Sequence, residues 1–394
     1  MKRQFPKITF WSGIFYIIIA AGVYTTFVRF TQGLGATTYL SDEFPWGLWI
    51  GFDVLCGVGL AAGGFVVASS VYIFNLEHYR PILRPAILTA FLGYILVIAS
   101  LMFDLGKPWN IWHPLVMWNP HSVMFEVGWC VMLYSIVLAL EFSPIIWERL
   151  QWGKLQKILH AITIPLVIAG VVLSSLHQSS LGSLYLIIPT KLHPLWYSSN
   201  LPYLFFISAI AVGPAMVTIE SYYSSRTFQR EIELPILSQL GKITVVALSV
   251  YLVLKAEDFV NLKLYTQFSS LTFENGMYAF EILGGVLVPL VLLAMPSVRN
   301  SKNGVFISSL FVVFGFILNR LNISITGIQQ YSNVNYFPHW MEITVTMMMV
   351  AIGFAVFHFA AKYLPIFHNE KSEKKPERVT NDIVSYIEFP ITTN

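Results

Sequence analysis

The chain has 394 residues, of which 56% are hydrophobic and 11% are charged, whereas a soluble domain has roughly 25% charged residues. This composition excludes an ordinary soluble protein and predicts a protein that crosses the membrane several times. The net charge of +3 is small and the basic residues fall in loops, which excludes a nucleic-acid-binding surface.

Ten apolar stretches are long enough to cross a bilayer, because a transmembrane helix needs about 20 residues. They are expected near residues 10–30, 46–76, 83–104, 122–142, 158–177, 202–222, 240–256, 275–296, 304–321 and 340–364. The first follows a basic start like that of a signal peptide. It has no small-residue cleavage site, so we interpret it as a retained helix. We expect one transmembrane domain over residues 1–364 and a charged C-terminal tail over residues 365–394.

The loop charges predict the orientation. If the N-terminus is cytoplasmic and the helices alternate, most of the 24 Lys and Arg residues lie in cytoplasmic segments. Cytoplasmic loops of membrane proteins are enriched in these residues. Both termini are therefore predicted to be cytoplasmic, and the loops rich in Trp, Pro, His and Tyr are predicted to face the outer side.

The second stretch carries an isolated acid. Asp53 lies in an otherwise uncharged run that extends to Leu76, about 10 Å below its outer end at about 1.5 Å per residue. A lone carboxylate at this depth indicates a functional site. The glycines that follow allow other helices, or a flat ligand, to approach the backbone; they are Gly57, Gly59, Gly63 and Gly64.

Other ionisable side chains also fall in the outer half of the predicted bundle. They are Asp53, Asp104, Glu126, His177, Glu281, Arg320 and Glu342. For Asp104 and Glu342, a position at the membrane interface without a functional role is an equally good interpretation. Arg320 is expected to be a counter-ion for Glu281 or Glu342. Asp53 and Glu126 need a partner, water or a proton at their depth, which favours a functional role.

The remaining residue patterns exclude several kinds of bound group. Cys56 and Cys130 form no Cys-x-x-Cys pair, so no iron–sulfur cluster or metal site is expected; both are predicted to be buried free thiols, with a disulfide as the alternative. A membrane haem needs two histidines facing each other from different helices. His358 lies well within a predicted helix without such a partner, so we expect no haem. Acids, a histidine and aromatic residues in an outer pocket suit a quinone, which needs hydrogen-bond donors and a proton route.

Six segments, in this order, resemble the NrfD or polysulfide reductase-type membrane subunits, and most closely the HybB-type membrane subunit of [NiFe] hydrogenase complexes. They are FPWGLWIGFD (44–53), SVMFE (122–126), ALEFSPIIWERL (139–150), HQSSLGSL (177–184), KLHPLW (191–196) and YFPHWME (336–342). The resemblance implies an all-α integral membrane protein with two four-helix bundles, helices 2–5 and 6–9, flanked by helices 1 and 10.

The resemblance also implies roles for individual residues. It assigns proton transfer to Asp53, Glu126 and Glu220, although the residues around Glu220 depart from the family's pattern. It implies a quinone site formed by Trp46, Asp53, Glu126, His177 and Gln178.

We therefore predict a quinone-reactive, cofactor-free membrane anchor of a respiratory oxidoreductase in the bacterial inner membrane, not catalytic alone. It would use menaquinone or ubiquinone as substrate. Its partners would be a periplasmic iron–sulfur ferredoxin-like subunit and a catalytic subunit: a hydrogenase, a molybdopterin enzyme or a multihaem cytochrome c.

Two alternatives stay open. One is a proton- or ion-coupled secondary transporter or channel. Such a transporter is expected to have acidic residues near the membrane midplane, beside broken helices. The other is a passive anchor whose acids only hold helices together.

Overall fold

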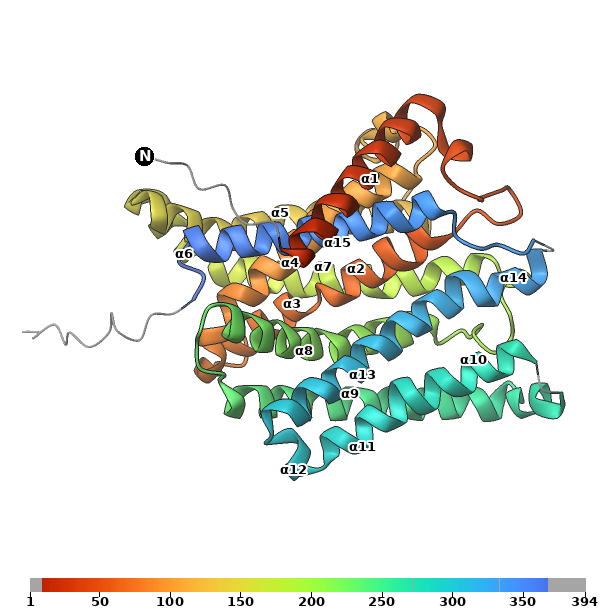
Figure 1. Cartoon of the computed structure of the whole chain (residues 1–394). Helices are drawn as coiled ribbons and strands as arrows, with labels where there is room; N and C mark the ends of the chain where they lie inside the picture. Colours follow the sequence, from red (N-terminus) through yellow and green to blue (C-terminus); the bar gives the residue numbers. More distant parts are fainter. Residues whose placement is uncertain (1–8, 271, 333, 368–394) are drawn as a thin grey trace, which may run out of the picture.

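The computed structural model of the chain describes residues 9–270, 272–332 and 334–367. Within these residues all regular structure is helical, and ten helical segments are long and apolar enough to cross a membrane (Figure 1). The prediction of an all-α protein with ten transmembrane helices is confirmed. The predicted orientation of the termini stays a prediction, and the predicted tail lies outside the described residues from position 368 onward.

Seven crossings are formed by single main helices. These are α1 (Phe10–Gln32), α4 (Arg80–Asp104), α5 (Val123–Leu150), α7 (Thr163–Leu184), α8 (Leu201–Thr227), α9 (Leu234–Asn261) and α15 (Trp340–Tyr363). Short elements connect them: η1 (Leu34–Ala36), η3 (Glu77–Tyr79), η4 (Pro108–Asn110), η5 (His113–Leu115), α6 (Gly153–Ala161), η6 (Tyr185–Ile187), η7 (Leu264–Ser269) and α12 (Pro296–Arg299).

The other three crossings each contain a π-helical segment. The second crossing consists of η2 (Trp49–Val54), α2 (Leu55–Leu60) and α3 (Gly63–Tyr72). The eighth consists of α10 (Phe273–Ile282), η8 (Leu283–Leu287) and α11 (Val288–Ala294), and the ninth of α13 (Lys302–Leu321), η9 (Asn322–Thr326) and α14 (Gly327–Ser332). Such π-helical segments are frequent at functional sites.

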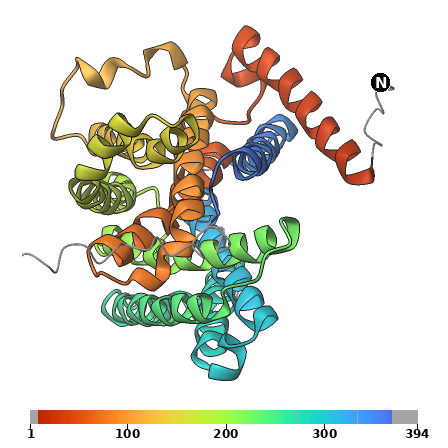
Figure 2. The same ribbon diagram turned by 90° about the vertical axis from the view of Figure 1, so that its left-hand side faces the viewer.

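The crossings form two bundles. In the first bundle the second crossing packs against α4 and α7, and α5 packs against the same two helices (Figure 1). In the second bundle α8 packs against α9 and α13, and α11 packs against the same two helices. The two flanking helices, α1 and α15, pack against each other, and α15 also packs against α4 (Figure 2). This is the predicted arrangement of helices 2–5 and 6–9 with helices 1 and 10 at the side.

The bundles meet where α3 crosses α8. A Cβ atom added to Gly213 would lie 2.9 Å from the backbone carbon of Ala62 and 2.9 Å from the nitrogen of Gly63. Two helix backbones in such close contact leave no room for a side chain. The glycines after Asp53 thus allow helix packing, as their spacing indicates.

Both cysteines are buried and free, which confirms their prediction. Cys56 donates a hydrogen bond from Sγ to the carbonyl oxygen of Gly51 at 3.3 Å. Its thiol therefore belongs to the packing of the second crossing.

Candidate functional site

Asp53 lies on the π-helical segment η2 and is 7% exposed. The hydroxyl group of Thr346, on α15, donates a hydrogen bond of 2.8 Å to Oδ2 of Asp53. The described residues supply no hydrogen bond to the other carboxylate oxygen, Oδ1. The second crossing thus presents one buried carboxylate oxygen that is free to bind a proton or a ligand.

Asp53 lines a cavity of about 520 Å³ between the second crossing, α4, α8 and α15. The cavity is mostly apolar, and its polar lining includes Thr89, Ser100, Glu220 and His358. Thr89 donates a hydrogen bond of 2.5 Å to Oε2 of Glu220. Thr89 and Ser100 lie on the same helix at positions that are about 16 Å apart at 1.5 Å per residue, so the cavity is elongated along α4.

His177 and Gln178 lie in the core of the first bundle and are both 0% exposed. Nδ1 of His177 shares a hydrogen bond of 2.8 Å with the hydroxyl of Tyr94, and Nε2 of Gln178 donates to the carbonyl oxygen of Val58 at 3.1 Å. Three buried polar atoms nearby make no hydrogen bond within the described part of the chain: Nε2 of His177, Oε1 of Gln178 and the hydroxyl of Tyr185. Buried polar groups of this kind call for water or a ligand.

Glu126 lies in the first turn of α5, where the hydroxyl of Ser180 donates a 2.6 Å hydrogen bond to its Oε1. The Glu126 side chain is exposed and Ser180 is buried, so the carboxylate marks the surface end of the His177 group. Trp46 packs its ring at 5.3 Å from the ring of Tyr185, at the edge of the same core.

The structure thus divides the predicted site residues into two groups. Asp53 and Glu220 line the cavity, whereas Trp46, Glu126, His177 and Gln178 lie around the core of the first bundle. No hydrogen bond among the described residues joins Asp53 to a member of the second group.

The sequence analysis did not identify Thr346, Tyr94 or Thr89, although each holds a predicted site residue. A hydroxyl group within an apolar run was the only available signal, and many structural residues share it. The pairing of a hydroxyl with a carboxylate depends on how each helix is rotated about its axis. An apolar run in the sequence does not determine this rotation.

A second polar group lies inside the other bundle. The carboxylate of Glu281 accepts hydrogen bonds from three side chains, at distances between 2.7 and 2.9 Å; they are Trp196, Asn319 and Asn322. Three donors occupy most of the acceptor positions of this carboxylate and fix its position.

Arg320 is connected to Glu281 through an amide. Its Nη1 donates to Oδ1 of Asn319 at 2.6 Å, its Nη2 donates to Ser208 at 2.7 Å, and its guanidinium carbon lies 3.6 Å from the ring centre of Phe205. The predicted role as a counter-ion therefore takes an indirect form, and no ion pair between the two side chains occurs in the described residues.

Glu342 lies in the first turn of α15 and takes part in its N-terminal capping box. It accepts a 2.5 Å hydrogen bond from the hydroxyl of Tyr336 and 3.1 Å and 3.2 Å bonds from the backbone N–H groups of His339 and Tyr39. Burial and the neighbouring Glu342 raise the pKa of Tyr336, so it remains a neutral donor. In the loop between α7 and α8, burial lowers the pKa of His193.

Comparisons with known proteins identify the family. The family described as polysulphide reductase, NrfD, matches residues 37–332. The chain is 33% identical to the probable Ni/Fe-hydrogenase 2 b-type cytochrome subunit of Escherichia coli, over 86% of this chain and 87% of that protein.

Two further relatives extend the comparison. The identity is 29% with the menaquinone reductase integral membrane subunit of Nitratidesulfovibrio vulgaris, over 94% of each chain. It is 24% with the Hdr-like menaquinol oxidoreductase integral membrane subunit of Archaeoglobus fulgidus, over 71% of this chain and 69% of that protein. This multi-pass membrane protein belongs to the NrfD family.

Proposed function

We propose that the chain is the quinone-reactive membrane subunit of a respiratory oxidoreductase and holds no redox cofactor of its own. It passes electrons between the quinone pool and a periplasmic iron–sulfur or multihaem cytochrome subunit, which connects it to a catalytic subunit. Relatives named for menaquinone, menaquinol and Ni/Fe-hydrogenase support this assignment. We take menaquinone as the substrate because the names of two relatives contain it or its reduced form.

The cavity beside Asp53 carries the proposal. Its volume of about 520 Å³ falls within the range of about 300–1,000 Å³ typical of small-molecule sites. Its lining is apolar with few polar groups, as a flat ring with two carbonyl oxygens requires. Thr346 holds Oδ2 of Asp53, which leaves Oδ1 to exchange a proton with a quinone oxygen.

The same cavity offers a proton route. Reduction of a quinone to a quinol consumes two electrons and two protons, and oxidation releases them. Glu220 lies toward the predicted cytoplasmic side, and Asp53 lies toward the outer side. We propose that protons move between these carboxylates through the cavity, with the hydroxyls of Thr89 and Ser100 along it.

The group around His177 does not line this cavity and contacts the second crossing through the hydrogen bond from Gln178 to Val58. If the hydroxyl of Tyr94 donates to Nδ1, the Nε2 atom of His177 carries a hydrogen and becomes a donor. Oε1 of Gln178, on the next residue, is a buried acceptor without a hydrogen bond in the described residues, and Glu126 lies at the surface. We propose that this group exchanges protons with the outer side; contacts of Trp46, His177 and Gln178 with the ring remain predictions.

The substitution Asp53→Asn tests the proposal in the complex purified from its native membrane. Asparagine keeps the acceptor for Thr346 but carries no exchangeable acid proton, so quinone turnover should fall at least about 100-fold. Reaction of the same complex with a soluble dye, which bypasses the quinone site, should stay unchanged and shows that the subunits assemble. Unchanged quinone turnover would contradict the proposal.

The absence of haem has its own test. An optical spectrum of the chain isolated from its partners should show no Soret band, because the proposed function needs no haem in this subunit. A stoichiometric b-type Soret band would contradict this part of the proposal.

A further inference from the structure

We propose that the groove between α1 and α15 binds the polyprenyl tail of the quinone and leads its ring sideways from the bilayer into the Asp53 cavity. The proposal rests on the proposed function. It concerns a second binding surface, for the hydrocarbon part of the substrate.

The groove exists because α1 and α15 separate along their length. A Cβ atom added to Gly22 would lie 2.4 Å from the sulfur of Met348, so the helices are in tight contact there. Arg29 fixes the same half of α1 by donating to the carbonyl oxygens of Phe103 and Leu105 at 2.6 and 2.7 Å. Toward its N-terminal end α1 leans away from the bundle (Figure 2).

The separated helices enclose a groove of about 800 Å³. On α1 its lining residues are Trp11, Ile14, Phe15 and Ile18, whose spacing places them on one helix face. On α15 the lining runs from Thr346 to Tyr363, which corresponds to about 26 Å of helix. This long, narrow and apolar shape fits an extended hydrocarbon chain.

The groove and the Asp53 cavity share one wall. Phe52, Val350, Phe354 and His358 line both spaces. Thr346 lines the groove and donates its hydrogen bond to Asp53, which lines the cavity. The Thr346 end of the groove therefore lies directly beside the proposed position of the ring.

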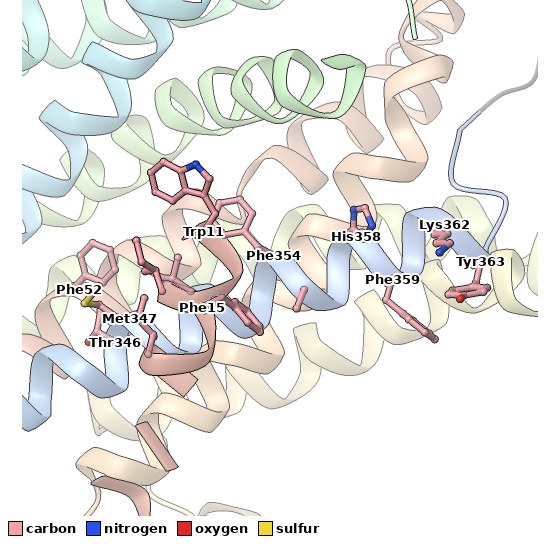
Figure 3. Close-up of a pocket in the computed structure, with 15 residues that line it drawn as sticks. Trp11, Phe15, Phe52, Thr346, Met347, Phe354, His358, Phe359, Lys362 and Tyr363 are labelled. Carbon is pink, nitrogen blue, oxygen red and sulfur yellow. The ribbon is translucent and has the colours of Figure 1, made fainter. Parts of the chain in front are cut away.

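Two of the four side chains in the shared wall are phenylalanines, Phe52 and Phe354. Figure 3 shows Phe52 and Thr346 toward one end of the groove, Lys362 and Tyr363 toward the other, and Phe354 between them. Phe354 is 68% exposed, so the packing of the described residues leaves room for it to turn. We infer that Phe52 and Phe354 are the side chains past which the ring moves.

The test compares two quinones that carry the same ring, one with a full polyprenyl tail and one without a tail (menadione). In the native complex reconstituted in vesicles, Ala355→Trp adds a large side chain inside the groove. Because each buried methylene group contributes to affinity, this variant should raise the KM for the tailed quinone about tenfold or more and leave the KM for menadione within about twofold.

Val356→Trp is the matched control. Val356 is the next residue on α15, is also exposed, and does not line the groove or the cavity. Tryptophan there should leave both KM values unchanged.

Three results would overturn the proposal. They are an unchanged KM for the tailed quinone in Ala355→Trp, an equal rise for both quinones, and an equal effect of Val356→Trp. A phospholipid that Ala355→Trp displaces without any change in KM would assign the groove to a structural lipid and would likewise overturn it. Failure of the proposed function gives a different pattern, in which the wild-type complex turns over neither quinone.

Discussion

Asp53 and Glu281 are two buried carboxylates that differ in the number of hydrogen-bond donors around them. Glu281 accepts hydrogen bonds from three side chains, whereas Asp53 accepts one from Thr346. Three of the roughly four acceptor positions of the Glu281 carboxylate are occupied, which suits a structural role. The free oxygen of Asp53 faces a cavity, which suits a group that binds and releases protons.

Thr346→Val tests the support that holds Asp53. Valine keeps the shape of threonine and removes the hydroxyl donor. We expect kcat for the quinone to fall about fivefold, which corresponds to the loss of one hydrogen bond. Thr344→Val, on the same helix but outside the cavity lining, should leave kcat unchanged. Equal effects of the two substitutions would show that the hydroxyl of Thr346 has no special role.

Glu126→Gln tests proton exchange at the surface end of the His177 group. Glutamine still accepts the hydrogen bond from Ser180 but does not titrate. Quinone turnover in the intact complex should fall at least about tenfold. Glu43→Gln, in the exposed segment before the second crossing, is the control and should have no effect. Normal turnover in Glu126→Gln would remove this residue from the proton route.

Among the helices, close contacts hold in place the three crossings that contain π-helical segments. The π-helical segment η2 packs against η9, and α13 packs against η8. The extra residue in each π-helical turn changes the direction of the side chains that follow. Asp53 on η2 and Asn322 on η9, which binds Glu281, both lie on such segments.

Gly213→Ala tests the contact between the two bundles. The added methyl group would lie 2.9 Å from the backbone of Ala62, which has no flexible side chain to move aside. Overpacking of this kind typically costs about 1–3 kcal/mol, so thermal unfolding in detergent should occur at a clearly lower temperature. At Gly276, on an exposed helix position, an added Cβ meets no atom within 4 Å, and Gly276→Ala should be neutral or stabilising. A lower melting temperature for both variants would contradict this account.

Glu281→Gln tests the polar group of the second bundle. The amide nitrogen of glutamine would face donors that now bind a carboxylate oxygen, and Arg320 would lose the balancing charge. We expect a loss of about 3 kcal/mol or more in unfolding free energy, seen as a lower melting temperature. Glu274→Gln on the same helix is the control, because its carboxylate makes no hydrogen bond in the described residues. Equal stability of the two variants would show that the Glu281 network is not structural.

For the whole molecule, the number and length of the apolar runs predict most of the fold. Ten long apolar runs became ten crossings because backbone groups in lipid must be satisfied within each helix. Helix ends were harder to predict. The crossing expected at 122–142 continues to Leu150, since charged residues after the apolar run still extend a helix beyond the membrane core. The ninth crossing continues through η9 to Ser332.

The site was predictable only in part. The position of Asp53 in a long apolar run identified it as an unusual residue. Its partner Thr346, however, is 293 positions away in the sequence. The expectation that Arg320 is a counter-ion for Glu281 or Glu342 did not include Asn319, which lies between Arg320 and Glu281 and binds both. The sequence does not encode the rotation of each helix about its axis, which decides such contacts.

Photolabelling of the native complex with an azido-menaquinone, followed by mass spectrometry of the labelled peptides, would locate the quinone ring directly. We expect labels on residues that line the Asp53 cavity, such as Phe52 and Ser100, and their loss when unlabelled menaquinone is added in excess. Specific labelling confined to α9 or α11, far from this cavity, would contradict this expectation.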